Sequence, residues 1–199
     1  MKSGYTENVL RGQIMSAIIM TIVILLIICA FFIGIYNNLV RLRQSVAESW
    51  SAIDTELRRR YDLIPNLVET VKGYAAHEKG TFEAVIEARN AAASSQASPE
   101  AQAKNENVLS GALRQLFALS ENYPQLKANE NFKQLQGDLD ETENRLSQAR
   151  RFYNANVREL NTAVESFPSS IVAGTTGFKA AQYFEIDDNA ARSPVAVKF

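Results

Sequence analysis

Near its N-terminus the chain has a long apolar segment, with no charged residue between Arg11 and Arg41. Residues 14–35 are mostly Ile, Leu, Val, Met, Phe and Ala, and about 20 such residues cross the hydrocarbon core of a bilayer as a helix. A buried core helix is usually shorter and keeps a polar stripe, and the apolar region of a cleaved signal peptide is about 7–15 residues long. The pattern therefore predicts a short tail over residues 1–13 and a single transmembrane helix over residues 14–36.

From Leu39 onward, apolar residues recur every three or four positions for about 37 residues, or about 55 Å at helical rise. This spacing predicts a helix that packs in a bundle or coiled coil, with only about residues 36–38 between it and the membrane segment. Pro65 removes one backbone donor and crowds the carbonyl of Tyr61, so we expect a kink in a helix that continues past it. The stripe consists of Leu39, Leu42, Val46, Trp50, Ile53, Leu57, Tyr61, Ile64, Val68, Val71 and Ala75.

Further helical patterns cover residues 81–93, 99–120 and 132–167, and no strand pattern of useful length occurs. Asn154, Asn156 and Asn161 lie close to the apolar seam of the last helix, where polar residues tend to fix register. The expected fold is all-α: one transmembrane helix followed by an elongated antiparallel bundle of about four helices over residues 37–186. Residues 187–199 show no periodicity, and we expect them to be disordered.

The distribution of charge argues against nucleic acid as a partner. The chain has 21 basic and 22 acidic residues, mixed along its length, for a net charge of −1. The sequence has no basic stripe of the kind that indicates nucleic-acid binding. Within the first bundle helix, Asp54 with Arg58 and Glu56 with Arg60 are spaced as i,i+4 pairs of a solvated face.

No arrangement typical of catalysis, metal binding or cofactor binding is present. His77 is the only histidine and Cys29 the only cysteine, which argues against metal sites built on these ligands. There is no G-x-S-x-G turn and no glycine-rich phosphate loop. We therefore predict that the chain is not an enzyme and uses no cofactor; a hydrolase built on His77 and unpaired carboxylates is the alternative.

One stretch is unusually rich in distinctive side chains for a simple bundle. Two interpretations are open for this stretch, which covers residues 50–66. Either Trp50 belongs to the core and the charged residues form weak surface pairs, or the kink at Pro65 presents these residues to a partner. The candidate docking residues are Trp50, Asp54, Arg59, Arg60, Asp62, Pro65 and Asn66.

Several segments resemble the LemA family, and the run RRYDLIPNLV is the most specific of them. They are Tyr36–Arg43, Trp50–Asp54, Arg59–Val68, Val71–Glu78, Tyr123–Asn129, Ala149–Asn154, Phe167–Pro168 and Gly177–Phe178. The resemblance implies a single-span protein of the bacterial inner membrane, with its helical domain in the cytoplasm. It implies no agreed activity and no catalytic residues.

Charges next to the membrane segment leave the orientation open. Lys2 and Arg11 precede the segment while Arg41 and Arg43 follow it, so the positive-inside rule gives a tie. Together these observations predict a membrane-anchored scaffold that docks unknown protein partners through its helical domain. Self-assembly as a homo-oligomer is the structural alternative.

Overall fold

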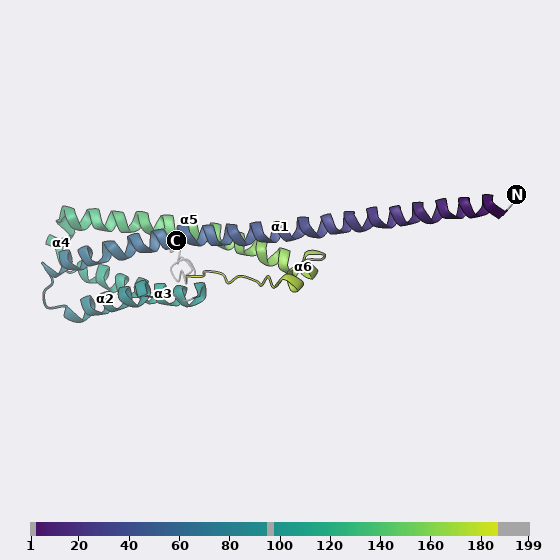
Figure 1. Ribbon diagram of the computed structural model, residues 1–199. Coiled ribbons are helices and arrows are strands. Elements are labelled where there is room, and N and C mark those ends of the chain that lie inside the picture. Colours follow the sequence, from purple (N-terminus) through teal and green to yellow (C-terminus); the bar gives the residue numbers. More distant parts are fainter. Residues whose placement is uncertain (1–2, 95–97, 187–199) are drawn as a thin grey trace, which may run out of the picture. The chain divides into compact units, whose positions relative to one another are not determined.

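The computed structural model describes residues 3–94 and 98–186 of the chain, and within them it contains helices and no β-strand. This confirms the predicted all-α class. The predicted disordered tail, residues 187–199, lies outside the described residues. The helices are α1 (Ser3–Lys72), α2 (Lys79–Ser94), α3 (Pro99–Ser120), α4 (Pro124–Ala128), α5 (Glu130–Glu165) and α6 (Ser169–Thr176) (Figure 1).

Helix α1 is longer than the sequence pattern suggested. It runs without interruption through residues 36–38, where we expected a short connection, and it also continues through Pro65. Tyr36, Asn37 and Asn38 cost only a few tenths of a kcal/mol each in a helix, whereas a break usually needs glycine or proline. The apolar segment and the first bundle helix are therefore one helix.

The described residues form two compact units, and each is described by itself. The N-terminal unit contains residues 3–44 and 160–180. The bundle unit contains residues 45–94, 98–159 and 181–186.

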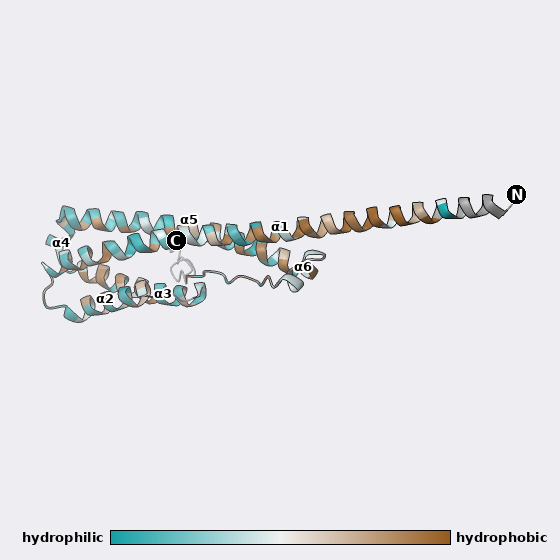
Figure 2. Ribbon diagram, in the orientation of Figure 1, coloured by the Kyte–Doolittle hydropathy of each residue, from teal (hydrophilic) through white to brown (hydrophobic). Residues whose placement is uncertain are grey.

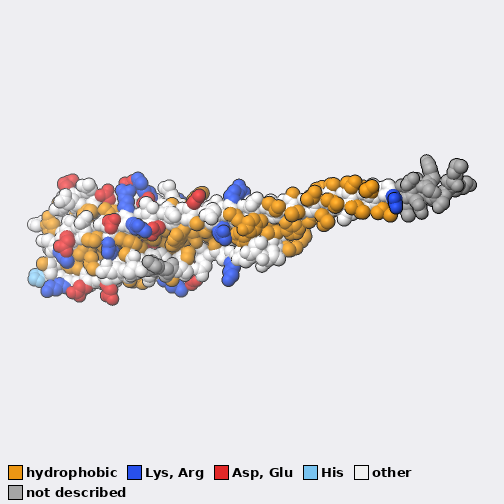
Figure 3. All heavy atoms as spheres, in the orientation of Figure 1, with side chains coloured by type: hydrophobic (Ala, Val, Ile, Leu, Met, Phe, Trp, Pro, Cys, Tyr) orange, Lys and Arg blue, Asp and Glu red, His pale blue; other side chains and the backbone are white. Residues whose placement is uncertain are grey.

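The N-terminal unit carries the apolar segment. Among the described residues, α1 is the one helix long and apolar enough to cross a membrane, and none of its apolar window is buried. Figure 2 shows this part of α1 as a continuous hydrophobic stretch, and on the face seen in Figure 3 it carries no charged side chain. Exposure of its large side chains ranges from 39% at Phe32 to 68% at Met20. The absence of any buried residue in this window distinguishes the segment from the core helix of a soluble protein.

The same unit closes around a small apolar cluster formed by α1, the end of α5 and α6. Leu39, Val172 and Ala173 are its buried members, and Ile35, Ala163, Val164 and Phe178 pack against them. Gly177 caps the C-terminus of α6, and its φ of 77° lies in the left-handed region that favours glycine. The turn brings the ring of Phe178 to 5.9 Å from that of Tyr36 and to 4.9 Å from the guanidinium carbon of Arg43.

The bundle unit is built on the stripe that the apolar spacing of α1 predicted. Its members from Ile53 to Ala75 are all at least 93% buried, and Val46 and Trp50 pack against the core at its edge. Helix α3 begins at Pro99 because Ser98 caps it, accepting a hydrogen bond from the Ala101 N–H at 3.4 Å. Helix α4 is a short turn that the sequence did not predict, and it buries Leu126 completely.

An extended C-terminal segment completes the core of the bundle unit. Phe184 is fully buried, and its ring lies 5.4 Å from that of Trp50. Asn154 holds this segment through both backbone groups of Phe184: its Nδ2 donates to the carbonyl at 3.0 Å, and its Oδ1 accepts from the N–H at 2.9 Å. Asn156 Nδ2 donates to the carbonyl of Ser45 at 3.3 Å. Polar residues near the seam thus fix the position of neighbouring backbone.

Candidate functional site

Four of the predicted docking residues share one side of α1. Asp54, Arg59, Asp62 and Asn66 are exposed or half-buried and line a shallow surface groove. The structure adds Arg58 to this face, where its Nη2 lies 2.9 Å from Asp54 Oδ2. Both partners of that pair are largely exposed, so it contributes at most about 1 kcal/mol to stability. We call Asp54, Arg58, Arg59, Asp62 and Asn66 the polar face of α1.

The other predicted residues lie elsewhere. Trp50 belongs to an aromatic cluster, with its ring 5.3 Å from that of Tyr153 and 5.4 Å from that of Phe184. Pro65 is half-buried inside the helix. Arg60 is only 3% exposed and points into the bundle unit. The structure therefore places these three residues outside the polar face.

Arg60 corrects one expectation from the sequence. The predicted solvated pair between Glu56 and Arg60 is wrong: Arg60 Nη1 instead donates to Glu106 Oε2 on α3 at 2.7 Å. Glu56 Oε2 and Arg60 Nε have no hydrogen-bond partner among the described residues. Position 60 is seven residues after Ile53 and four before Ile64, so it lies at the edge of the apolar stripe, and the contacts of Arg60 with α3 and α5 bury this edge.

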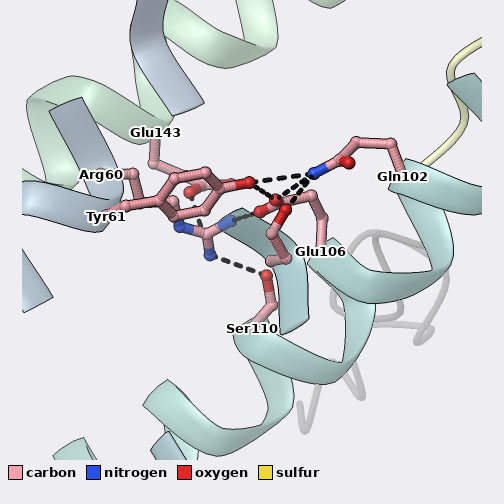
Figure 4. A network of polar contacts seen from close by, with 7 residues as sticks. Arg60, Tyr61, Gln102, Glu106, Ser110 and Glu143 are labelled. Atoms are coloured by element: carbon pink, nitrogen blue, oxygen red, sulfur yellow. Dashed lines mark hydrogen bonds and ion pairs between the residues drawn. The ribbon is translucent and has the colours of Figure 1, made fainter. Parts of the chain in front are cut away.

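A polar network surrounds this buried ion pair (Figure 4). Arg60 Nη2 donates to Ser110 Oγ at 2.8 Å and lies 3.5 Å from Glu143 Oε2 on α5. The Tyr61 hydroxyl donates to Glu106 Oε1 through a short hydrogen bond. Gln102 Nε2 contacts the Tyr61 hydroxyl oxygen at 2.9 Å and Glu106 Oε1 at 3.1 Å. Both carboxylate oxygens of Glu106 are thus occupied.

The environment of Tyr61 determines its protonation. Burial raises the pKa of the Tyr61 hydroxyl far above its ordinary value, and the charge of Glu106 and the hydrogen bond to it raise the pKa further. The hydroxyl therefore stays a donor to the carboxylate at neutral pH. Glu106 is completely buried. A substrate cannot reach this carboxylate, so the network acts as a structural connection between α1 and α3.

A second, partly buried contact compensates for Pro65. Proline has no N–H, so the carbonyl of Tyr61, four residues earlier, lacks its usual helical donor. Arg89 on α2 supplies one, because its Nε donates to the Tyr61 carbonyl at 3.1 Å. This contact explains how α1 continues through a proline while α2 is held against it.

His77 is exposed in the turn between α1 and α2, and Cys29 is exposed in the apolar part of α1. Within residues 3–94 and 98–186, no group of three or more His, Cys, Asp or Glu side chains could hold a metal ion.

Comparison with known proteins identifies the family. The model of the LemA family matches residues 49–199. The chain belongs to the LemA family. Two magnetosome proteins of Paramagnetospirillum magneticum, MamQ 1 and MamQ 2, are each 24% identical over 200 residues, covering 88% of this chain and 74% of each relative. Magnetosome protein MamQ of Magnetospirillum gryphiswaldense is 23% identical over 199 residues, covering 87% and 73%.

The resemblance seen in the sequence is thereby confirmed, and the LemA-family chain is a membrane-associated helical protein. Sequence reasoning missed Gln102 and Glu106 as partners of α1. Their signal was present, because both fall on the apolar stripe of α3 that continues through Leu109, Leu113 and Leu116. Two polar residues on a buried stripe require polar partners, and the sequence alone could not say which helix supplies them.

Proposed function

We propose that this LemA-family chain is a membrane-anchored scaffold that docks a protein partner on the polar face of α1. In this proposal α1 anchors the chain in the bacterial inner membrane and the bundle unit lies in the cytoplasm, as the family resemblance implies. The chain acts by binding and not by catalysis.

The observation that carries the proposal is the arrangement of charges on α1. From Asp54 to Asn66 the face extends for about 18 Å at helical rise, and its two arginines lie between two aspartates. Such a mixed pattern of charges favours a partner of complementary pattern and discriminates against others, since like charges brought together cost several kcal/mol.

Rigidity supports the same proposal. The reverse side of α1 is held by the Arg60–Glu106 pair, and Trp50 is packed between Tyr153 and Phe184. A surface that is already ordered loses less conformational entropy when a partner binds, so more of the contact energy contributes to affinity.

The test is photocrosslinking of the full-length chain in its native membrane. A photoreactive residue replaces Asp62, and adducts are compared with and without the double charge reversal Arg58→Glu and Arg59→Glu. Arg60 is left intact, because a carboxylate at position 60 would lie beside buried Glu106 and unfold the bundle unit. The matched control reverses two exposed arginines of α5, Arg151→Glu and Arg158→Glu, which changes the net charge equally.

We expect one discrete adduct that the Arg58/Arg59 reversal removes and the Arg151/Arg158 reversal leaves. An adduct with the mass of two copies of this chain would instead indicate self-assembly. Equal yields from both reversals, with unchanged circular-dichroism melts, would show that the polar face of α1 does not dock the partner.

A further inference from the structure

The N-terminal unit has a second uncharged segment besides the apolar part of α1. Residues 166–178, bounded by Glu165 and Lys179, contain no charged side chain. This segment includes α6, which has eight residues and is too short to cross a bilayer. Phe167 is 82% exposed and Ile171 is 50% exposed. Exposure of single apolar side chains is ordinary, so the meaning of these two depends on what lies beside them.

The position of this segment within the unit points to lipid. Its buried residues Val172 and Ala173 pack with Leu39 and Ile35, at the end of the charge-free part of α1. The charge-free part is about 33 Å long from residue 14 to residue 35, close to the thickness of a hydrocarbon core. Residues that pack at Ile35 therefore lie at the boundary between acyl chains and headgroups.

Aromatic and basic residues at the same level fit that boundary. Tyr36 is 42% exposed and its ring contacts that of Phe178. Aromatic side chains are enriched at the headgroup level of membrane proteins. The guanidinium of Arg43 lies over the Phe178 ring, and a basic group at this level would lie beside the headgroups.

Three hydroxyl groups of the segment are already hydrogen-bonded to backbone. Ser169 Oγ donates to the Ser166 carbonyl at 2.9 Å, and Thr175 Oγ1 donates to the Ile171 carbonyl at 3.0 Å. Thr176 Oγ1 donates to the Val172 carbonyl at 2.6 Å. Hydroxyls that are already hydrogen-bonded to backbone cost little to remove from water.

We propose that residues 167–178 lie in the headgroup–acyl boundary, with Phe167 and Ile171 inserted among the lipids, and give the chain a second membrane contact. The inference rests on the proposed function, because it requires α1 to be inserted. A helix that crosses the bilayer alone can rotate about its axis, whereas a second contact beside it restricts that rotation.

Site-directed spin labelling of the full-length chain tests the proposal. In a Cys29→Ala background, a single cysteine replaces Phe167, Ile171, Phe152 or Val23, and each labelled chain is reconstituted in phosphatidylcholine–phosphatidylglycerol vesicles. The readout is collision with oxygen, which concentrates in lipid, against collision with a water-soluble nickel chelate. Phe152 is the matched control, an exposed phenylalanine fifteen residues earlier on α5. Val23 reports whether α1 is inserted.

We expect the oxygen-to-nickel collision ratio at positions 167, 171 and 23 to exceed the ratio at position 152 several-fold. A high ratio at position 23 with low ratios at 167 and 171 would overturn the second membrane contact and leave the anchor intact. A low ratio at position 23 would overturn the anchor and this inference together. Labels at 167 and 171 that collide with neither reagent would mean that protein, such as a second copy, covers these residues, and would also overturn the inference.

Discussion

The ion pair between Arg60 and Glu106 makes the bundle unit sensitive to loss of either partner alone. Arg60 is 3% exposed and Glu106 is 0% exposed. Replacing Glu106 with leucine leaves a buried guanidinium whose remaining carboxylate is Glu143, at 3.5 Å and half exposed. Replacing Arg60 with methionine leaves a buried carboxylate. Each single substitution should lower the free energy of unfolding by about 3–5 kcal/mol, the usual cost of an uncompensated buried charge.

The double substitution Arg60→Met with Glu106→Leu should cost less than either single one. No buried charge remains in it, and similar apolar replacements of buried pairs are often neutral. A residual loss of about 1 kcal/mol is expected, because the Tyr61 hydroxyl loses its acceptor. Adding Tyr61→Phe should recover most of that loss.

Urea unfolding of the full-length chain in detergent micelles measures these differences. Trp50 is the only tryptophan and lies in the bundle unit beside Tyr153 and Phe184, so its fluorescence reports unfolding of that unit. The reasoning is refuted if Glu106→Leu costs less than about 1 kcal/mol with an unchanged dependence on urea, or if the double substitution costs as much as the two single ones added together.

Two further predictions concern the same part of α1. Arg89→Met should lower the free energy of unfolding by about 1–3 kcal/mol, because it leaves the Tyr61 carbonyl without a donor. In a Pro65→Ala background the helix itself supplies that donor, so Arg89→Met should barely shift the urea midpoint. An equal shift in both backgrounds would contradict the assignment. Because burial raises the pKa of Tyr61, the folded state keeps a proton that the unfolded state loses, so stability should fall as pH rises above about 10. Tyr61→Phe should flatten this fall in urea midpoints measured from about pH 9 to about pH 11, and an unchanged slope would count against the raised pKa.

Tyr153 is a second buried tyrosine that must be controlled for in the pH experiment on Tyr61. Burial also raises the pKa of Tyr153, so the wild-type slope contains a second contribution. Tyr153→Phe should remove a separate part of it, and the double variant should show the smallest slope. Additive losses are expected because the two tyrosines lie in different contacts, one on Glu106 and the other donating to the Gln182 carbonyl at 2.8 Å.

Short elements show where sequence patterns were too weak to predict the fold. Helix α3 begins at Pro99 and ends at Ser120 as predicted, because proline and a capping serine mark its start locally. Helix α6 was missed because its residues, SSIVAGTT, have poor helix propensity, and it is packing on Leu39 that stabilises it. The structure likewise shows α1 continuous at residues 36–38, where no helix-breaking residue occurs.

Arg60 illustrates the same limit for the candidate site. Heptad spacing correctly placed Ile53, Leu57 and Tyr61 in the core, since it depends only on the helical period. The pairing of charges suggested that Arg60 lies on a solvated face, although it is seven residues after Ile53 and four before Ile64 and so falls at the edge of that stripe. Whether a flank of a helix is buried depends on how many neighbours it has, and that is a property of the whole bundle.

The sequence by itself determined that this is an all-helical LemA-family chain with an apolar segment long enough to cross a membrane. These features follow from hydrophobic periodicity and segment length, which act locally along the chain. Only the tertiary structure decided that Arg60 is buried against Glu106, that Arg89 satisfies the carbonyl freed by Pro65, and that Asn154 holds Phe184. Each of these contacts joins residues at least 28 positions apart, and such pairings are set by the packing of helices rather than by any local pattern.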